Sequence, residues 1–195
     1  MASEILNLSS DTLQNLTSLR GSTVISIGSP QDEFNDSWLS EGFPIFFSVS
    51  EGDFVFYVDL EDCSIKPVGD SLPRLHMFRE SQVQFDFEGD EFAMYHFWEG
   101  EIIQDLFVIR DTYAFTLHGQ SSEIVMDRGI GIITNKRVVT VASAFAHDVA
   151  SLLLAHEPNV DGRVGVITQP AVLDLTWIDE LQHTRHLLAI DEVRA

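Results

Sequence analysis

Two histidines near the end of the chain, His183 and His186, have a spacing that could serve metal binding. Residues three apart share one face of a helix, and Asp179 or Glu180 would add a carboxylate one turn earlier. A catalytic metal centre also needs a third ligand and hydrogen-bonded outer partners, for which the sequence offers no pattern. We therefore interpret both residues as histidines that face solvent, and we expect neither a metal nor a cofactor.

The sequence evidence for other catalytic groups is equally weak. The chain contains neither a glycine-rich phosphate-binding motif nor the G-x-S-x-G turn of serine hydrolases. Cys63, the single cysteine, lies in the acidic segment LEDCSIK, where neighbouring carboxylates raise a thiol pKa and weaken the nucleophile. No glycosidase-type carboxylate pair can be singled out among 31 acidic residues. The sequence favours a non-enzymatic protein, and a small hydrolase stays an open alternative.

The acidic residues are the most unusual group in the composition. They outnumber the 11 basic residues and give a formal net charge of −20. Such a charge repels phosphate backbones and anionic membranes, so we expect no direct nucleic-acid or membrane binding. It would attract a basic protein partner. Two other interpretations stay open, namely an acidic face that keeps the protein soluble and the acid-rich composition of a salt-loving source.

Acidic and aromatic residues combine most densely in VQFDFEGDEFAMYHFWEGE, residues 83–101, which contains no lysine or arginine. Its first half alternates apolar and polar residues at period two, which predicts a strand with one buried face. Residues 92–98 show no clean alternation, so either both faces of this strand are covered or one of Tyr95, Phe97 and Trp98 is partly exposed. We predict a partner-binding surface here. Its candidate residues are Asp86, Glu88, Asp90, Glu91, Tyr95, Trp98, Glu99 and Glu101.

A helix is predicted before the first strand. Leu13, Leu16 and Leu19 have helical spacing, and Ser9 or Ser10 offers an N-cap. Short alternating runs separated by turns then predict successive antiparallel strands, beginning at STVISIG and continuing with a hairpin around residues 50–53. Further turns are expected at residues 128–129 and 135–136, and a loop with at most a short edge strand is expected at residues 62–74.

In the C-terminal third of the chain, the spacing of apolar residues changes from that of strands to that of helices. Residues 141–157, VASAFAHDVASLLLAHE, place apolar side chains at helical spacing and predict an amphipathic helix. Thr176 and Asp179 have the spacing of a capping box, which predicts a last helix that continues through Leu181 and Leu188.

These elements predict an α+β fold in a single domain, residues 1–195. It comprises an antiparallel β-meander of about seven to nine strands with an N-terminal helix and two C-terminal helices. No apolar run reaches the length of a membrane span, and Glu4 stands where a secretory signal would carry positive charge. A single cysteine suits a reducing compartment, so we expect a cytoplasmic protein.

The segment GIGIITNKRVVTVAS, residues 129–143, resembles the strand-turn-strand of bacterial PH-like and GRAM-type domains. A similar T-N-[KE]-R turn recurs in those domains and would here be formed by residues 134–137. The resemblance implies a small binding module, built as a modest barrel closed by one helix.

Two other segments resemble bacterial toxin-immunity proteins of the SUKH group. They are the strand GDFVFYVDLED at residues 52–62 and the stretch at residues 141–157 with its Ser-x-Phe sequence. This resemblance implies a stoichiometric inhibitor that caps the basic active site of a cognate toxin, and the charge points independently to a basic partner. Our leading hypothesis is therefore a non-enzymatic immunity protein. Alternatives are a nucleic-acid mimic that inhibits a basic protein, a PH/GRAM-like module, and a structural module; a homodimer is also compatible with the sequence.

Overall fold

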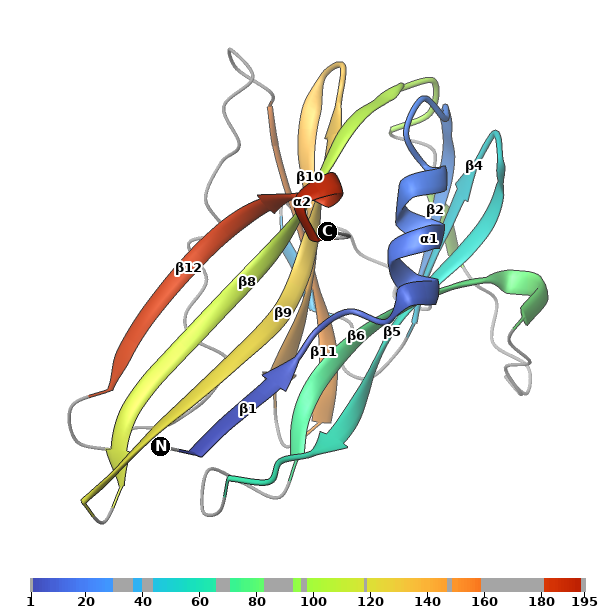
Figure 1. Ribbon diagram of the computed structural model, residues 1–195. Coiled ribbons are helices and arrows are strands. Elements are labelled where there is room, and N and C mark those ends of the chain that lie inside the picture. Colours follow the sequence, from blue (N-terminus) through green and yellow to red (C-terminus); the bar gives the residue numbers. More distant parts are fainter. Residues whose placement is uncertain are drawn as a thin grey trace.

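The computed structural model describes residues 2–29, 37–39, 44–65, 71–82, 93–95, 98–117, 119–146, 149–158 and 181–193. These residues form two sheets of mostly antiparallel strands, and a short helix lies beside the smaller sheet (Figure 1). Strands make up most of the described part of the chain, which contains only two short α-helices and one 3-10 turn. The prediction of an α+β fold with two C-terminal helices is therefore wrong.

The chain begins with β1 (Ala2–Leu6) and α1 (Ser10–Ser18). Ser9 caps the helix, because its hydroxyl oxygen accepts a hydrogen bond from the backbone N–H of Thr12 at 3.1 Å. Leu16 points from the helix into the core and is fully buried. The predicted N-terminal helix is confirmed.

The smaller sheet has five strands in the order β6-β5-β4-β2-β7. These strands are β2 (Val24–Ser29), β4 (Ile45–Val49), β5 (Gly52–Asp62), β6 (Ser71–Arg79) and β7 (Ala93–Tyr95), and a 3-10 turn, η1 (Glu80–Gln82), follows β6. The hairpin predicted around residues 50–53 is confirmed as the β4–β5 turn. β6 is longer than the short edge strand expected, and Pro73 is tolerated there because an edge strand need not donate on both sides.

The larger sheet has seven strands, of which six follow the order β12-β8-β9-β10-β11-β3. They are β3 (Ser37–Leu39), β8 (Ile103–Leu117), β9 (Gln120–Thr134), β10 (Arg137–Ala146), β11 (Val149–Pro158) and β12 (Gln182–Ala189), and α2 (Ile190–Val193) follows the last. The seventh strand is β1, which pairs with β9 in parallel. In Figure 1, β12, β8, β9 and β1 run side by side.

β9 changes its second neighbour halfway along its length. Residues 122–126 pair with β1, whereas residues 129–133 pair with β10. Between these two stretches, Ile109 pairs with Gly129 and Arg110 pairs with Asp127, which leaves Arg128 as the extra residue of a β-bulge. The sheet therefore forks at Arg128, and the turn predicted at residues 128–129 is instead a bulge within one strand.

The helix predicted at residues 141–157 is wrong, because the described residues of this stretch, 141–146 and 149–157, form parts of β10 and β11, which pair antiparallel. Residues 138–143 are all buried, so both faces of β10 are covered. A strand buried on both faces shows no apolar-polar alternation, and its apolar run can match helical spacing by chance.

The predicted last helix is also wrong over residues 182–189, which form β12 against β8. Its predicted start at Thr176 lies outside the described residues. Leu181 and Leu188 fit a helical face, but the backbone pairing with β8 overrides that local pattern. Only residues 190–193 are helical.

The main apolar cluster lies between the two sheets. It contains buried residues of α1, of β4 to β6 in the smaller sheet, and of β8 to β11 in the larger one. α1 is fixed to β6 by the side-chain amide of Asn15, which donates to the carbonyl oxygen of Met77 at 3.1 Å. No helix in the described residues is long and apolar enough to cross a membrane.

Three rings form an aromatic ladder across β5 and β6. Tyr57 and His76 are direct cross-strand partners whose ring centroids lie 5.0 Å apart, and Phe78 stacks at 5.3 Å from Tyr57 and 5.9 Å from His76. Burial, followed by the positive charge of Arg74, lowers the pKa of His76. The folded protein therefore resists protonation of this imidazole.

We predict that His76 makes the protein less stable in mild acid. Because the folded-state pKa is lowered, its contribution to stability is complete above the unfolded-state value of about 6.5 and is lost as the pH falls through the folded value. The variant His76→Phe should flatten the unfolding free energy between about pH 8 and pH 5, measured by urea denaturation. His186→Phe, at an exposed position of β12, is the matched control and should keep the wild-type slope. An unchanged slope in His76→Phe would contradict the prediction.

Candidate functional site

Three carboxylates of the described chain are buried, namely Glu101, Asp111 and Asp127. Each contacts at least one arginine. A buried carboxylate without a partner would be strongly destabilising, so these pairings are a condition of the fold. They differ in how many arginines surround each acid.

Glu101 lies just before β8 and contacts the turn between β9 and β10. Its carboxylate accepts hydrogen bonds from the hydroxyl of Thr134 at 2.6 Å and from Nε of Arg137 at 2.8 Å. The Thr134 hydroxyl oxygen also accepts from the backbone N–H groups of Lys136 and Arg137. Asn135 exchanges two hydrogen bonds with the backbone of Ile102. The predicted turn at residues 135–136 is confirmed, and these contacts explain the residue types at Thr134, Asn135 and Arg137.

Asp127 connects β9 to β8 and to the N-terminal segment. Arg110 donates to both carboxylate oxygens, from Nε at 2.7 Å and from Nη2 at 3.1 Å. The backbone N–H of Leu8 donates to the same carboxylate at 2.9 Å. Because Arg110 and Asp127 are cross-strand partners, this pair follows directly from the β8–β9 register.

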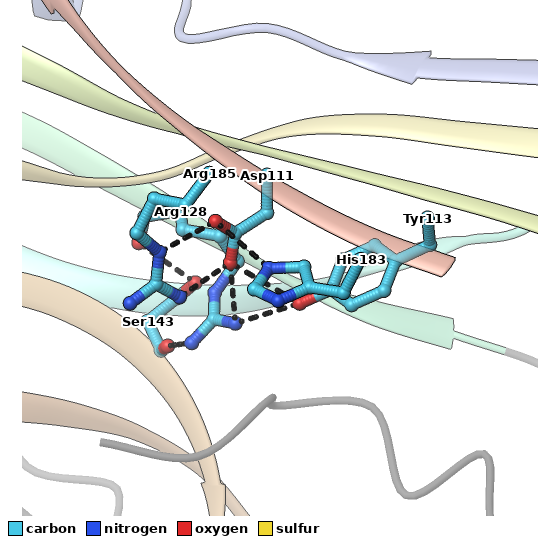
Figure 2. Close-up of polar contacts among 6 residues, drawn as sticks. All are labelled: Asp111, Tyr113, Arg128, Ser143, His183 and Arg185. Carbon is cyan, nitrogen blue, oxygen red and sulfur yellow. Dashed lines mark hydrogen bonds and ion pairs between the residues drawn. The ribbon is translucent and has the colours of Figure 1, made fainter. Parts of the chain in front are cut away.

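Asp111 lies at the centre of the largest network, which we call the Asp111 cluster (Figure 2). Arg185 donates to both carboxylate oxygens at 2.6 Å, and His183 Nε2 lies 3.2 Å from Oδ1. Tyr113 donates its hydroxyl to Oδ2 at 3.2 Å, and Nη1 of Arg128 lies 3.5 Å from the same oxygen. The sixth member is Ser143, whose carbonyl oxygen accepts from Nη2 of Arg128.

The strand register brings the cluster together. Arg185 opposes Asp111 and His183 opposes Tyr113 across the β12–β8 pair, and the rings of His183 and Tyr113 stack at 4.9 Å. Arg128 enters from the bulge of β9, and its carbonyl oxygen accepts from the hydroxyl of Ser143. Pairing of β10 with β9 ends at Ala142, so Arg128 and Ser143 hold the two strands together where the sheet forks.

The charges of the cluster are set by burial and by hydrogen bonding. Burial alone would raise the pKa of Asp111, but hydrogen bonds and positive charge from Arg185, with the charge of Arg128, outweigh it and lower the pKa. Burial raises the pKa of Tyr113 to about 12 and lowers the pKa of Arg128. The hydrogen bond with Asp111 raises the pKa of Arg185. At neutral pH the cluster thus holds one carboxylate, one neutral phenol and two guanidinium groups.

This arrangement is poorly suited to acid-base or nucleophilic catalysis. Asp111 is too weak a base, Tyr113 is too weak an acid, and Ser143 is fully buried and donates to a backbone carbonyl. Burial, more than neighbouring carboxylates, raises the pKa of Cys63, which is also buried. What the cluster can do is bind β12 to β8 and link β9 to β10 through Arg128 and Ser143.

The spacing argument for a metal site at His183 and His186 assumed a helix, and these residues lie in a strand. In a strand, residues three apart point to opposite faces, and His183 is turned toward Tyr113. Within the described residues, no group of three or more His, Cys, Asp or Glu side chains could hold a metal ion.

The predicted binding surface is only partly described. Asp86, Glu88, Asp90 and Glu91 lie outside the described residues, and Tyr95 is described only as the last residue of β7.

Three other predicted surface residues are placed. Glu99 is exposed. Trp98 is 2 % exposed and contacts the guanidinium of Arg137, and Glu101 is 1 % exposed. Trp98 and Glu101 are therefore buried in the interior, and we no longer include them in the proposed contact surface.

The Asp111 cluster is not evident from the sequence alone. One local signal exists, because Asp111 stands in the same period-two series as Ile109, Tyr113 and Phe115, which are all buried. A carboxylate within an apolar series indicates a buried, paired acid. Its partners Arg128 and Arg185 carry no comparable signal. Comparison of the chain with family models, with curated proteins and with solved structures gives no match in any of the three.

Proposed function

We propose that this chain is a non-enzymatic protein that binds a basic protein partner, in the manner of an immunity protein that neutralises a cognate toxin. The observation that supports this proposal most directly is that the described arginines are engaged in contacts within the protein. Seven arginines are described, and each guanidinium makes an internal contact. The seven are Arg20, Arg74, Arg79, Arg110, Arg128, Arg137 and Arg185.

These contacts make the outer surface more acidic than the composition alone implies. Four of the arginines neutralise the three buried carboxylates, so their charge does not offset exposed acids. Exposed carboxylates along β5 and its turn include Glu51, Asp59 and Asp62. A surface of this kind accelerates the encounter with a basic protein and disfavours acidic competitors.

The aromatic ladder supplies a candidate anchor beside these acids. Tyr57 lies two residues from Asp59 on the same strand face, and its ring is only half-buried against His76 and Phe78. Binding energy at protein interfaces is concentrated in a few aromatic or arginine side chains, whereas surrounding charges set the rate. We therefore place the partner surface on β5 and β6, with Glu99 as a separate test position.

Reversing charge on β5 should slow association. The triple variant Glu51→Lys, Asp59→Lys, Asp62→Lys should reduce the association rate constant with the basic protein encoded beside this chain by roughly tenfold or more at low salt. The measurement is surface plasmon resonance at several salt concentrations. Glu157→Lys, an exposed acid on β11, is the single-reversal control and should cause a much smaller change.

Two outcomes would contradict the assignment. If the triple variant binds the partner with an unchanged association rate, β5 is not the binding surface. If Glu99→Lys alone strongly slows association, the binding surface lies at the turn before β8. If the partner is a nucleic-acid-binding protein, added DNA or RNA should compete with this chain. That result would favour the nucleic-acid mimic over the immunity protein.

A further inference from the structure

A short ladder of backbone contacts joins the start of β2, in the smaller sheet, to the start of β8, in the larger one. Thr23 pairs with Ile102 as an isolated antiparallel bridge. Next to this bridge, the backbone N–H of Val24 donates to the carbonyl oxygen of Glu101 at 2.8 Å. The chain segments that lead into β2 and β8 therefore lie side by side.

Two isoleucines point outward from this junction. Ile102 is 47 % exposed and Ile25 is 42 % exposed, although the residues on either side of each in the chain are buried or half-buried. Ile102 shares a face with Thr23, its direct cross-strand partner. Residues two apart along a strand also share a face, so Ile25 lies on the same side as Thr23. Both isoleucines therefore belong to one outward face of the junction.

Ile25 is the additional residue of a β-bulge in β2. Val24 and Ser26 oppose two consecutive residues of β4, Val49 and Ser48. Val24 and Ser26 are both buried, so the bulge leaves Ile25 on the outward face. Bulges of this kind redirect a side chain and are common beside functional sites. A single exposed apolar side chain needs no explanation, whereas apolar side chains gathered on one face indicate a contact site.

This outward face continues into the acidic partner surface on β5. The carbonyl oxygen of Thr23 accepts a hydrogen bond from the backbone N–H of Ser50 at 2.9 Å, and the N–H of Thr23 donates to the Ser50 hydroxyl oxygen at 3.1 Å. Ser50 precedes Glu51, an exposed acid of the proposed partner surface. Glu99, which is also exposed, stands three residues before Ile102. The two isoleucines thus have acidic neighbours that a basic protein would contact.

The charges around the junction select its occupant. On the side of Ile102 away from Thr23, Asn135 exchanges two hydrogen bonds with the Ile102 backbone, and the exposed Lys136 follows Asn135. The basic side chains of a partner would therefore lie over Glu51, away from Lys136. A second copy of this chain is disfavoured, because each copy carries a net charge of −20 and the two would repel.

We propose that Ile102 and Ile25 are the apolar anchors of the interface with the basic protein partner. The matching part of that partner is an apolar side chain or pocket flanked by lysine or arginine, which faces Glu51. This inference rests on the proposed function and assigns a separate kinetic role to the isoleucines. Apolar anchors at the centre of an interface mainly determine the dissociation rate, whereas exposed charges mainly determine the association rate.

The test measures dissociation from the basic protein encoded beside this chain, immobilised for surface plasmon resonance. Ile102→Ser should raise the dissociation rate constant roughly tenfold or more and leave the association rate constant nearly unchanged, because it removes apolar contact area but no charge. Ile25→Ser should act in the same direction. Ile102→Leu keeps the apolar area and should retain most of the affinity. The matched control is Ile5→Ser, which makes the same change at a 61 % exposed isoleucine on β1 and should alter neither rate.

Each outcome decides between the inference and its alternatives once circular dichroism has shown that the variants are folded. If the wild type forms the complex and Ile102→Ser dissociates at the wild-type rate, the isoleucines are not anchors, and the proposed function still stands. If the wild type forms no complex with that protein, the proposed function and this inference both fail. An equal effect of Ile5→Ser would overturn the assignment to this face. A dimer in analytical ultracentrifugation that Ile102→Ser dissociates would make a second copy the occupant and would also overturn it.

Discussion

Replacing Asp111 by asparagine should lower the free energy of unfolding by about 3 to 5 kcal/mol. The carboxylate is fully buried, and its removal takes the ion pair with Asp111 from the buried guanidinium of Arg128 and from the half-buried guanidinium of Arg185. The loss of the Arg185 contact also weakens the attachment of β12 to β8. Urea denaturation at neutral pH, followed by circular dichroism, measures the change.

The same variant has a signature in acid. Because the pKa of Asp111 is lowered in the folded state, its stabilisation is present above the unfolded value of about 3.9 and is lost as the pH falls through the folded value. Asp111→Asn should therefore lack part of the acid-induced loss of stability seen in the wild type. Asp105→Asn, whose carboxylate is 53 % exposed beside Arg20, is the control and should change stability by less than about 1 kcal/mol. Equal effects of the two variants would show that burial of Asp111 is not decisive.

A single added methyl group at Gly129 should destabilise the protein by about 3 kcal/mol. A Cβ atom there would lie 2.5 Å from the carbonyl oxygen of Val141 and 2.7 Å from Cα of Ala142. Both atoms belong to the backbone of β10, so relief requires the two strands to separate at the fork. Gly129→Ala should therefore lower the Tm and weaken hydrogen-exchange protection in β10 more than elsewhere.

Two comparisons make this prediction specific. Gly131→Ala would place its Cβ 1.8 Å from Cζ of Phe107, the far end of a side chain and not backbone, so its cost should be smaller than that of Gly129→Ala. Ser121→Ala, at an exposed position of the same strand, should stay within about 0.5 kcal/mol of the wild type. If Gly131→Ala destabilised the protein more than Gly129→Ala, close contact with the β10 backbone at the fork would not be the larger cause of destabilisation.

The parts of the fold that could be predicted are those with a local cause. α1 has its own cap and apolar face, and the β4–β5 hairpin alternates around a turn. The second half of β10, from Val141 on, could not be recognised as a strand, because residues 138–143 are buried on both faces and so lack the polar face that marks a strand. The two-sheet arrangement depends on pairings such as Ala2 with Ser122, which leave no trace in either segment alone.

The candidate site follows the same rule. Glu99 and Glu101 look alike in the sequence, yet Glu101 is buried because Thr134 and Arg137 arrive from a turn more than thirty residues later. The Asp111 cluster needs β12, which the helical spacing of Leu181 and Leu188 concealed. A long-range partner decides in each case whether an acidic side chain faces water or an arginine.

The parallel pairing of β1 with β9 also constrains how the protein is made. Ala2 leaves the ribosome before its partner Ser122, which is synthesised 120 residues later. At about 5 to 20 residues per second, the N-terminal strand waits roughly 6 to 24 s before its partner exists. During that interval Ile5, which stays 61 % exposed even after folding, and Leu6, which becomes buried, are both open to chaperones and to other nascent chains. A fusion that holds residues 2–6 away from β9 would therefore impair biogenesis before it altered any property of the finished molecule.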